Sequence, residues 1–327
     1  MKSFLLRIFL FTAIFTGLLL LLGPPLAVPG EFDYVGGIVV KHARLNEMKG
    51  NRVIFAGGSN VAFGLDSKMV EDAIHMPVVN LGLHGGLGLD FILQELEHNV
   101  RAGDVVFLSA EYFLEKGRYD LDYAAGKFLP DAGNYYEQDF YTTFKHLVEA
   151  KFDQVCYNRD RLMLRFKPAA IRERKAELEQ VYSRHAFNSY GDVIAHLDLR
   201  PDGAPATPLK LQSGYWDGIA KINKANDIIS AKGAKLYFLF PTFAKSSYEF
   251  NKSVIHQYQA SILADLKVTV LNKPEDFVYP DSLFFDSYYH LTKKTRIWRT
   301  EKMISLIRPY VATTVAPAQQ LTFSNHK

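Results

Sequence analysis

Short apolar runs alternate with amphipathic stretches along two parts of the chain. Five runs rich in β-branched and aromatic residues predict strands, at 52–56, 78–81, 104–109, 235–240 and 267–271. Stretches whose apolar positions have helical spacing predict helices, at 67–74, 90–100, 216–229, 248–266 and 292–310. Strands that alternate with helices in this way indicate βαβ units and a parallel sheet. Because the strands are almost fully apolar, we expect helices on both faces of the sheet.

The alternation is interrupted between residues 113 and 212. Aromatic residues gather in this segment, at Tyr135, Tyr136, Phe140 and Tyr141. A basic run extends from Arg159 to Lys175 and includes Arg161. We interpret the segment as a mostly helical insertion after the third strand. The predicted fold is therefore α/β, a doubly wound and mostly parallel five-stranded sheet flanked by helices, as a single domain over residues 31–327.

The first 30 residues have a pattern of their own. Lys2 and Arg7 precede an uncharged apolar run from Ile8 to Leu22, and prolines follow at positions 24, 25 and 29. A basic start before an apolar run is typical of a secretory signal or a membrane anchor. Since no cleavage site is visible, we favour an uncleaved single-pass anchor in the inner or cytoplasmic membrane over a removed signal peptide. Both interpretations place the rest of the chain outside the cytoplasm, in the periplasm.

Charge and cysteine content exclude some partners. A net charge of +3 over 327 residues is too small for a nucleic-acid-binding surface, and we expect no nucleic acid partner. The single cysteine, Cys156, cannot form an intrachain disulfide and has no zinc-ligand spacing around it. We expect neither a metal nor an organic cofactor, because the serine-based chemistry that the motifs of this chain indicate requires none.

A candidate nucleophile follows the first strand. This strand leads into Gly57-Gly58-Ser59-Asn60, where two glycines allow a sharp turn and leave the serine uncrowded at the carboxyl edge of the sheet. A serine in that position can attack a carbonyl group. The alternative is a glycine-rich turn in which Ser59 caps the next helix. A phosphate-binding loop is disfavoured because the G-x-x-x-x-G-K-[ST] pattern is absent.

Two further segments supply the partners that such a serine needs. The second strand ends in Asn80-Leu81-Gly82, and a glycine amide at this edge can contribute to an oxyanion hole. His84 lies in the same turn and ranks below His290 as a candidate base. His290 stands just before the last helix, with Asp286 four residues upstream. A carboxylate in that position can fix the tautomer of the imidazole.

This order of serine, glycine and Asp-His resembles the SGNH (GDSL-like) hydrolase superfamily. Within it, the chain resembles the membrane-anchored bacterial members associated with acylation of cell-envelope polysaccharide or teichoic acid. The resemblance covers residues 52–109 and 235–309. It implies that Ser59 is the nucleophile, His290 the base and Asp286 its orienting carboxylate. Gly82, with the Ser59 amide, would form part of the oxyanion hole.

The chain departs from the family pattern twice. The third block, usually G-x-N-D, is replaced by Ser109-Ala110-Glu111-Tyr112. This leaves Asn60 and Asn80 as candidates for the missing oxyanion donor. The interval between Asp286 and His290 is one residue longer than in the usual D-x-x-H motif, so Asp281 or Ser287 are alternatives for orienting the imidazole.

The resemblance implies a serine esterase or O-acyltransferase that acts on acyl esters of a cell-envelope polysaccharide. Water would end the cycle of an esterase, and a sugar hydroxyl that of a transferase. The aromatic residues at 135–141 are suited to stacking on sugar rings, and the basic run is suited to an anionic polymer or lipid head groups. An ordinary amphipathic helical cap is the other interpretation of both segments. The alternative is a non-catalytic accessory protein that binds a glycan or a membrane-bound acyltransferase, which the missing third block favours.

Overall fold

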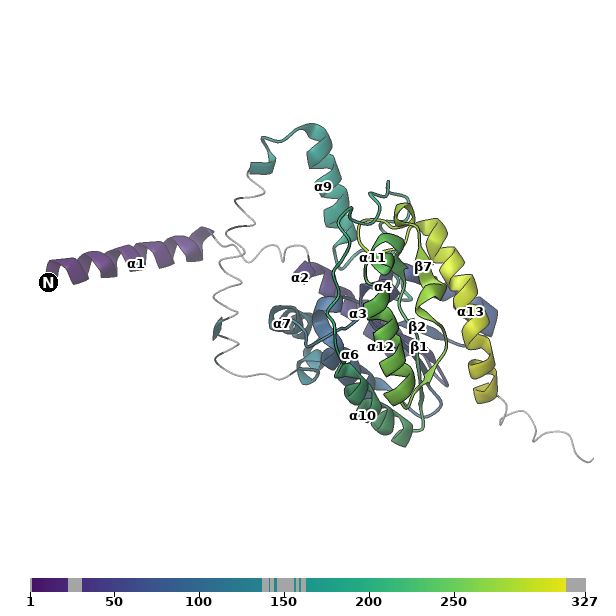
Figure 1. The fold of residues 1–327 in the computed structure, drawn as a ribbon. Coiled ribbons are helices and arrows are strands. Elements are labelled where there is room, and N and C mark those ends of the chain that lie inside the picture. Colours follow the sequence, from purple (N-terminus) through teal and green to yellow (C-terminus); the bar gives the residue numbers. More distant parts are fainter. Residues whose placement is uncertain are drawn as a thin grey trace, which may run out of the picture.

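Five parallel strands form the centre of the protein. The computed structural model (Figure 1) describes residues 2–22, 31–136, 141, 144–145, 156, 159 and 163–315. The strands follow the order β2-β1-β3-β4-β6, and each neighbouring pair is parallel. Their bounds are Val53–Gly57 (β1), Val78–Asn80 (β2), Val105–Ser109 (β3), Lys235–Phe238 (β4) and Thr269–Val270 (β6). The predicted α/β class with a mostly parallel five-stranded sheet is confirmed.

Helices cover both faces of this sheet. Ile54 and Val106 pack on one face with α6, α10 and α12, whereas Phe55 and Phe107 pack on the other with α5 and α13. Successive side chains of a strand point to opposite faces, so strands that are apolar at every position need cover on both sides. The helices are Ser67–Ile74 (α5), Gly88–Asn99 (α6), Gly218–Ala231 (α10), Lys252–Asp265 (α12) and Lys293–Val315 (α13).

A third apolar cluster surrounds the segments that follow β1 and β2. Phe63, Leu83 and Leu87 belong to these segments and pack against buried residues from residues 31–47 and from the segment between β3 and β4, among them Tyr34 and Val181. The elements involved are Glu31–Tyr34 (α2), Val35–Gly37 (η1), Ile38–Glu47 (α3), Ser59–Gly64 (α4), Gly85–Leu87 (η2), Tyr119–Phe128 (α7), Pro130–Asn134 (η3) and Ala169–Val181 (α9). This cluster covers the side of the molecule on which the candidate residues lie.

Residues 31–47 are helical, although the sequence pattern predicts no helix there. They form α2, η1 and α3, with Tyr34, Val35 and Ile38 almost completely buried. The Tyr34 hydroxyl donates a hydrogen bond to the Leu83 carbonyl oxygen at 3.1 Å. These helices are too short for their apolar positions to show a helical period. Their apolar residues are buried by packing against segments far away in the sequence.

The predicted helix over 248–266 is divided in two. Lys245–Phe250 (α11) and α12 are separated at Asn251. The Asn251 side chain accepts a hydrogen bond from the Leu211 amide at 2.9 Å and donates one to the Leu209 carbonyl at 2.5 Å. These long-range bonds explain the break, which local spacing does not indicate. The C-terminal part also contains Phe243–Ala244 (β5), Pro274–Phe277 (η4), Val278–Tyr279 (β7) and Asp281–Leu283 (η5), of which β5 and β7 pair as a small separate sheet.

The segment between β3 and β4 adds helices to the fold. Where the structure describes it, it contains α7, η3 and α9 and no strand of the five-stranded sheet. Phe140 and Arg161, from the aromatic group and the basic run, lie outside the described residues. An insertion over 113–212 therefore stays a prediction.

The predicted membrane anchor is wrong. Lys2–Leu22 (α1) is helical (Figure 1). Residues Ser3 to Leu18 are exposed, except for Gly17, which is half-buried. Within the described ranges, no helix combines the length and the apolarity that a bilayer crossing requires. The uncharged run after Arg7 has 15 residues, whereas a transmembrane helix needs about 20. The periplasmic location and the membrane contact, which were inferred from this anchor, lose their basis with it.

Candidate functional site

The turn after β1 places Ser59 at the start of a helix. Ser59 is half-buried and is the first residue of α4. A Cβ atom on Gly57 would lie 2.2 Å from the Ser109 carbonyl oxygen, and one on Gly58 would lie 2.4 Å from Glu111 Oε2. Only glycine avoids these overlaps without a shift of its neighbours. The two glycines therefore let β1 pass directly into α4 beside the end of β3.

His290 and Asp286 form a buried pair in the loop before α13. His290 Nδ1 lies 2.8 Å from Asp286 Oδ1, and the two side chains are only 9% and 15% exposed. A carboxylate partner requires a proton on Nδ1, which leaves Nε2 as the acceptor nitrogen of a neutral imidazole. The loop backbone supports the pair, since the Phe285 amide donates to the His290 carbonyl oxygen at 2.7 Å. This arrangement is that of a general base with its orienting carboxylate.

Tyr182 joins this pair from the end of α9. Its hydroxyl donates to Asp286 Oδ2 at 2.6 Å and lies 3.2 Å from His290 Nδ1. Burial, together with the nearby Asp286, raises the pKa of Tyr182 far above its ordinary value, so the hydroxyl keeps its proton. Burial acts to raise the pKa of Asp286 as well, but hydrogen bonds from His290 and Tyr182 outweigh it and lower this pKa below its usual value. Asp286 is therefore ionised at neutral pH.

Phe63 connects the Ser59 helix to the imidazole. The rings of Phe63 and His290 stack with centroids 3.8 Å apart and planes 7° from parallel. Phe63 follows Ser59 by four residues, so both side chains lie on one face of α4, a single turn apart. Between Ser59 and His290, both of which the structure describes, no hydrogen bond forms. Such bonds often tighten only when substrate binds, and the predicted contact stays a prediction.

Glu111 lies directly beside Ser59. Its carboxylate accepts hydrogen bonds from the Gly58 amide at 3.2 Å and from the Asn60 amide at 3.0 Å, the two amides that flank Ser59. Glu111 is only 7% exposed and follows the end of β3 by two residues. The carboxylate thus ties β3 to the start of α4 and engages two backbone donors next to the candidate nucleophile.

The three predicted oxyanion donors already have acceptors within the protein. The Gly82 amide donates to Asn80 Oδ1 at 2.9 Å. The Asn80 side chain donates to Asp192 at 2.8 Å, and the Asn60 side chain donates to the Ser109 carbonyl at 2.8 Å. Both asparagines are completely buried. The structure brings these residues together around the start of α4, and their oxyanion role stays a prediction.

The alternative candidates are engaged elsewhere. Asp281 accepts a hydrogen bond from a backbone amide near the start of α11 at 3.0 Å. Ser287 accepts hydrogen bonds from the amides of its own loop. Asp286 is therefore the carboxylate that contacts His290. The Nδ1 atom of His84 accepts a hydrogen bond from the amide two residues further along at 2.8 Å, as in a turn-forming role.

A buried arginine supports the Ser59 helix from α13. Arg299 is 1% exposed and donates to the Asn60 carbonyl oxygen at 2.6 Å and to the Asn60 side chain at 3.1 Å. Burial lowers the pKa of Arg299 to about 10, so the guanidinium remains charged at neutral pH. A Cβ atom on Gly64 would lie 2.2 Å from Arg299 Nη1. A side chain at position 64 would therefore require Arg299 to shift.

Sequence reasoning did not assign a role to Tyr182, Glu111 or Arg299. The position of Glu111 after β3, where the family pattern has its third block, was the one available signal. Tyr182 and Arg299 reach the site through contacts between distant segments, for which the local sequence contains no pattern.

The side chains of this site are a hydroxyl, an imidazole and carboxylates on separate elements. Among the described residues, no group of three or more His, Cys, Asp or Glu side chains is placed to hold a metal ion. No family model matches the chain, and no curated protein matches it.

Proposed function

We propose that the protein is a serine esterase or O-acyltransferase of the SGNH (GDSL-like) type that acts on acyl esters of a glycan. The observation that carries this proposal is the buried His290–Asp286 pair, stacked through Phe63 on the helix that begins with Ser59. The parallel sheet supports it, because ligands of such sheets bind beyond the carboxyl ends of the strands. Ser59 lies at that edge.

The proposed reaction begins with proton transfer from Ser59 to His290 Nε2. Ser59 Oγ attacks the ester carbonyl, and Asp286 stabilises the imidazolium that forms. His290 then protonates the leaving alkoxide, which leaves an acyl group on Ser59. Water attacks this acyl-enzyme to release an acid, or a sugar hydroxyl attacks it to form a new ester.

The oxyanion of this reaction requires donors beside Ser59. The amides of Gly58 and Asn60, the residues on either side of Ser59, donate to the Glu111 carboxylate. A bound ester therefore competes with Glu111 for these donors. Displacement of the Glu111 carboxylate on binding would make them available to the developing negative charge.

A non-catalytic glycan-binding protein is the second candidate function. The engagement of Gly82, Asn60 and Asn80 with internal acceptors favours it, because a preorganised oxyanion hole has free donors. In that case Ser59 would serve only to start α4 after a glycine turn.

Acyl-enzyme trapping separates the two candidates. The protein is incubated with p-nitrophenyl acetate, quenched in acid and digested, and the Ser59 peptide is measured by mass spectrometry. We expect the added mass of one acetyl group on this peptide and none in Ser59→Ala. A matched control is Ser183→Ala, which removes a half-buried serine whose hydroxyl bonds to the backbone of its own turn, and which should leave the label in place. If the Ser59 peptide of the unsubstituted protein carries no acetyl group, the result would favour the non-catalytic glycan-binding function.

Changes to the histidine partners should lower kcat in a defined order. Asp286→Asn should reduce kcat by about 10²- to 10⁴-fold, because the imidazole loses the carboxylate that fixes its tautomer. Tyr182→Phe removes one hydrogen bond to that carboxylate and should reduce kcat by roughly 10-fold, with KM unchanged. Steady-state kinetics on the activated ester measure both effects.

Two control substitutions accompany this measurement. Tyr215→Phe alters an exposed tyrosine and should have no effect on kcat. Asp281→Asn should also have little effect, because Asp281 bonds to a backbone amide and not to His290. A larger loss in Asp281→Asn than in Asp286→Asn would contradict the assignment of the orienting carboxylate.

A further inference from the structure

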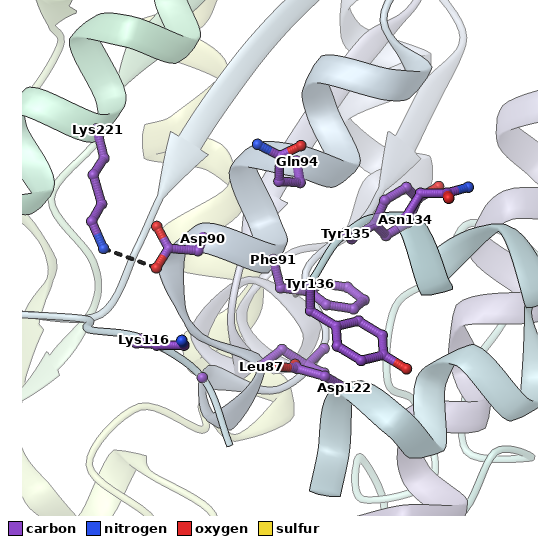
Figure 2. A pocket seen from close by; sticks show the side chains of 11 residues that line it. Leu87, Asp90, Phe91, Gln94, Lys116, Asp122, Asn134, Tyr135, Tyr136 and Lys221 are labelled. Atoms are coloured by element: carbon purple, nitrogen blue, oxygen red, sulfur yellow. Dashed lines mark hydrogen bonds and ion pairs between the residues drawn. The ribbon is translucent and has the colours of Figure 1, made fainter. Parts of the chain in front are cut away.

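A separate pocket lies between η2, α6, α7, η3 and α10 (Figure 2). Its volume is about 510 Å³, which falls within the range of small-molecule sites. The η2 turn borders both this pocket and the Ser59 site. A Cβ atom on Gly85 would lie 3.6 Å from the Glu111 carboxyl carbon, and Leu87, two residues later, lines the pocket.

An unpartnered carboxyl group lines this pocket. Asp122 is 6% exposed, and its Oδ1 atom has no hydrogen-bond partner in the described part of the chain. Burial raises the pKa of Asp122 to about 8. The nearby Asp120 and Asp90 add to the rise, and Lys116 acts against it. At neutral pH the group is therefore mostly protonated and can both donate and accept a hydrogen bond. Buried polar atoms in proteins almost always have partners, so a ligand atom is the natural partner for Oδ1.

Three charged side chains, Asp90, Lys116 and Lys221, line the pocket beside the mostly protonated Asp122, and Lys116 has an interaction of its own. Asp90 and Lys221 form an ion pair at 2.8 Å at one end of it, visible as the dashed line in Figure 2. The described residues that line it include no arginine, the side chain best suited to carboxylate and phosphate groups. The remaining polar groups include the neutral amides of Gln94 and Asn134. These features favour an uncharged ligand that carries several hydrogen-bonding groups.

Aromatic side chains form the rest of the wall. Phe91 from α6 and Tyr136 after η3 line the pocket near Asp122 (Figure 2). Tyr119 packs edge-on against Tyr136, with ring centroids 5.5 Å apart and planes at 84°, which fixes the orientation of the Tyr136 ring. An oriented aromatic ring offers a flat apolar surface to the C–H face of a ligand ring.

We infer that this pocket binds one neutral sugar ring, whose hydroxyl groups bond to Asp122 and to the Gln94 and Asn134 amides while its C–H face contacts Tyr136. The binding itself is independent of chemistry at Ser59. Only the role of the pocket as the part of the substrate site that holds the glycan rests on the proposed function.

Saturation-transfer NMR on the full chain carrying Ser59→Ala tests this inference without turnover. The probes are glucose, glucosamine and glucuronate at pH 7, which differ chiefly in charge. We expect glucose to bind most tightly. Asp122→Leu should weaken glucose binding by about 10-fold or more, whereas Asp122→Asn, which keeps a donor and an acceptor, should stay within about 3-fold of the parent protein.

Matched controls and a second variant secure the interpretation. Asp131→Leu alters an exposed carboxylate in η3 and should leave the affinity unchanged. Tyr136→Ala should weaken binding, whereas Tyr215→Ala, at a tyrosine that is 62% exposed and does not line the pocket, should not. Circular dichroism establishes that each variant is folded.

The pH dependence gives an independent test. Glucose binding should weaken as the pH rises through about 8, because the ionised Asp122 no longer donates. In Asp122→Asn the affinity should not change over this range. Equal glucose affinity in the parent protein and Asp122→Leu, a preference for glucosamine or glucuronate, or no binding of any probe would overturn the inference. Ester turnover by the Ser59-containing protein is measured separately, so failure of the sugar site and failure of the proposed function give different results.

Discussion

Ser59→Ala should reduce turnover of an activated ester by roughly 10⁴-fold or more, and His290→Ala should have an effect of similar size. Each change abolishes the same step, because Ser59 is a poor nucleophile unless His290 takes its proton. The double variant should therefore be hardly slower than either single variant. Measurement of kcat/KM for all three, with the parent protein as reference, tests this expectation.

The chain offers a matched control for the histidine. His256 and Glu275 form a second histidine–carboxylate pair, at 3.2 Å, but both side chains are 48% exposed. His256→Ala should therefore leave kcat/KM unchanged. Full activity of Ser59→Ala would contradict the catalytic proposal and leave glycan binding as the function. Additive losses in the double variant would show that Ser59 and His290 do not act together.

Asp192→Ala should lower the free energy of unfolding by about 3–5 kcal/mol. Asp192 is completely buried and accepts hydrogen bonds from Ser67 Oγ at 2.5 Å, Asn80 Nδ2 at 2.8 Å and Arg296 Nη2 at 3.0 Å. Its loss leaves Arg296, which is 4% exposed, without its closest carboxylate. Urea denaturation followed by circular dichroism measures the change.

An exposed ion pair serves as the control for this prediction. Asp198 pairs with Lys293 at 2.7 Å, but its side chain is 87% exposed. Asp198→Ala should therefore change the free energy of unfolding by no more than about 1 kcal/mol. Equal free energies of unfolding for Asp192→Ala and Asp198→Ala would contradict the prediction, because they would show that the buried network around Asp192 contributes no net stability.

The sheet was predictable because its signal is local. Apolar runs such as 104–109 and helical spacing such as 67–74 can be read within one segment, and both elements are present. The helices in 31–47 and the break at Asn251 depend on contacts with residues far along the chain. The membrane anchor was inferred from the basic start and apolar run of the first segment. That inference failed because the segment is too short and not apolar enough to cross a bilayer.

The part of the candidate site that could be predicted is the part whose residues stand next to a strand or helix end in the sequence. Ser59 follows β1 and His290 precedes α13, and parallel topology brings such positions to one edge. The choice of Asp286 over Asp281 required the structure, because both lie in one loop and only their contacts distinguish them. The contribution of Tyr182 required it too, because residues 182 and 286 are 104 positions apart.

The helix α9 should open at a lower temperature than the rest of the domain. Of its 13 residues only Val181 is buried, and Tyr182 follows it directly. Segments with few buried contacts open in local fluctuations that cost much less free energy than global unfolding. When α9 opens, the Tyr182 hydroxyl leaves Asp286 while the sheet and its covering helices remain intact. Heat inactivation should therefore begin several degrees below the melting of the domain. A ligand that holds α9 closed should raise the temperature at which activity is lost.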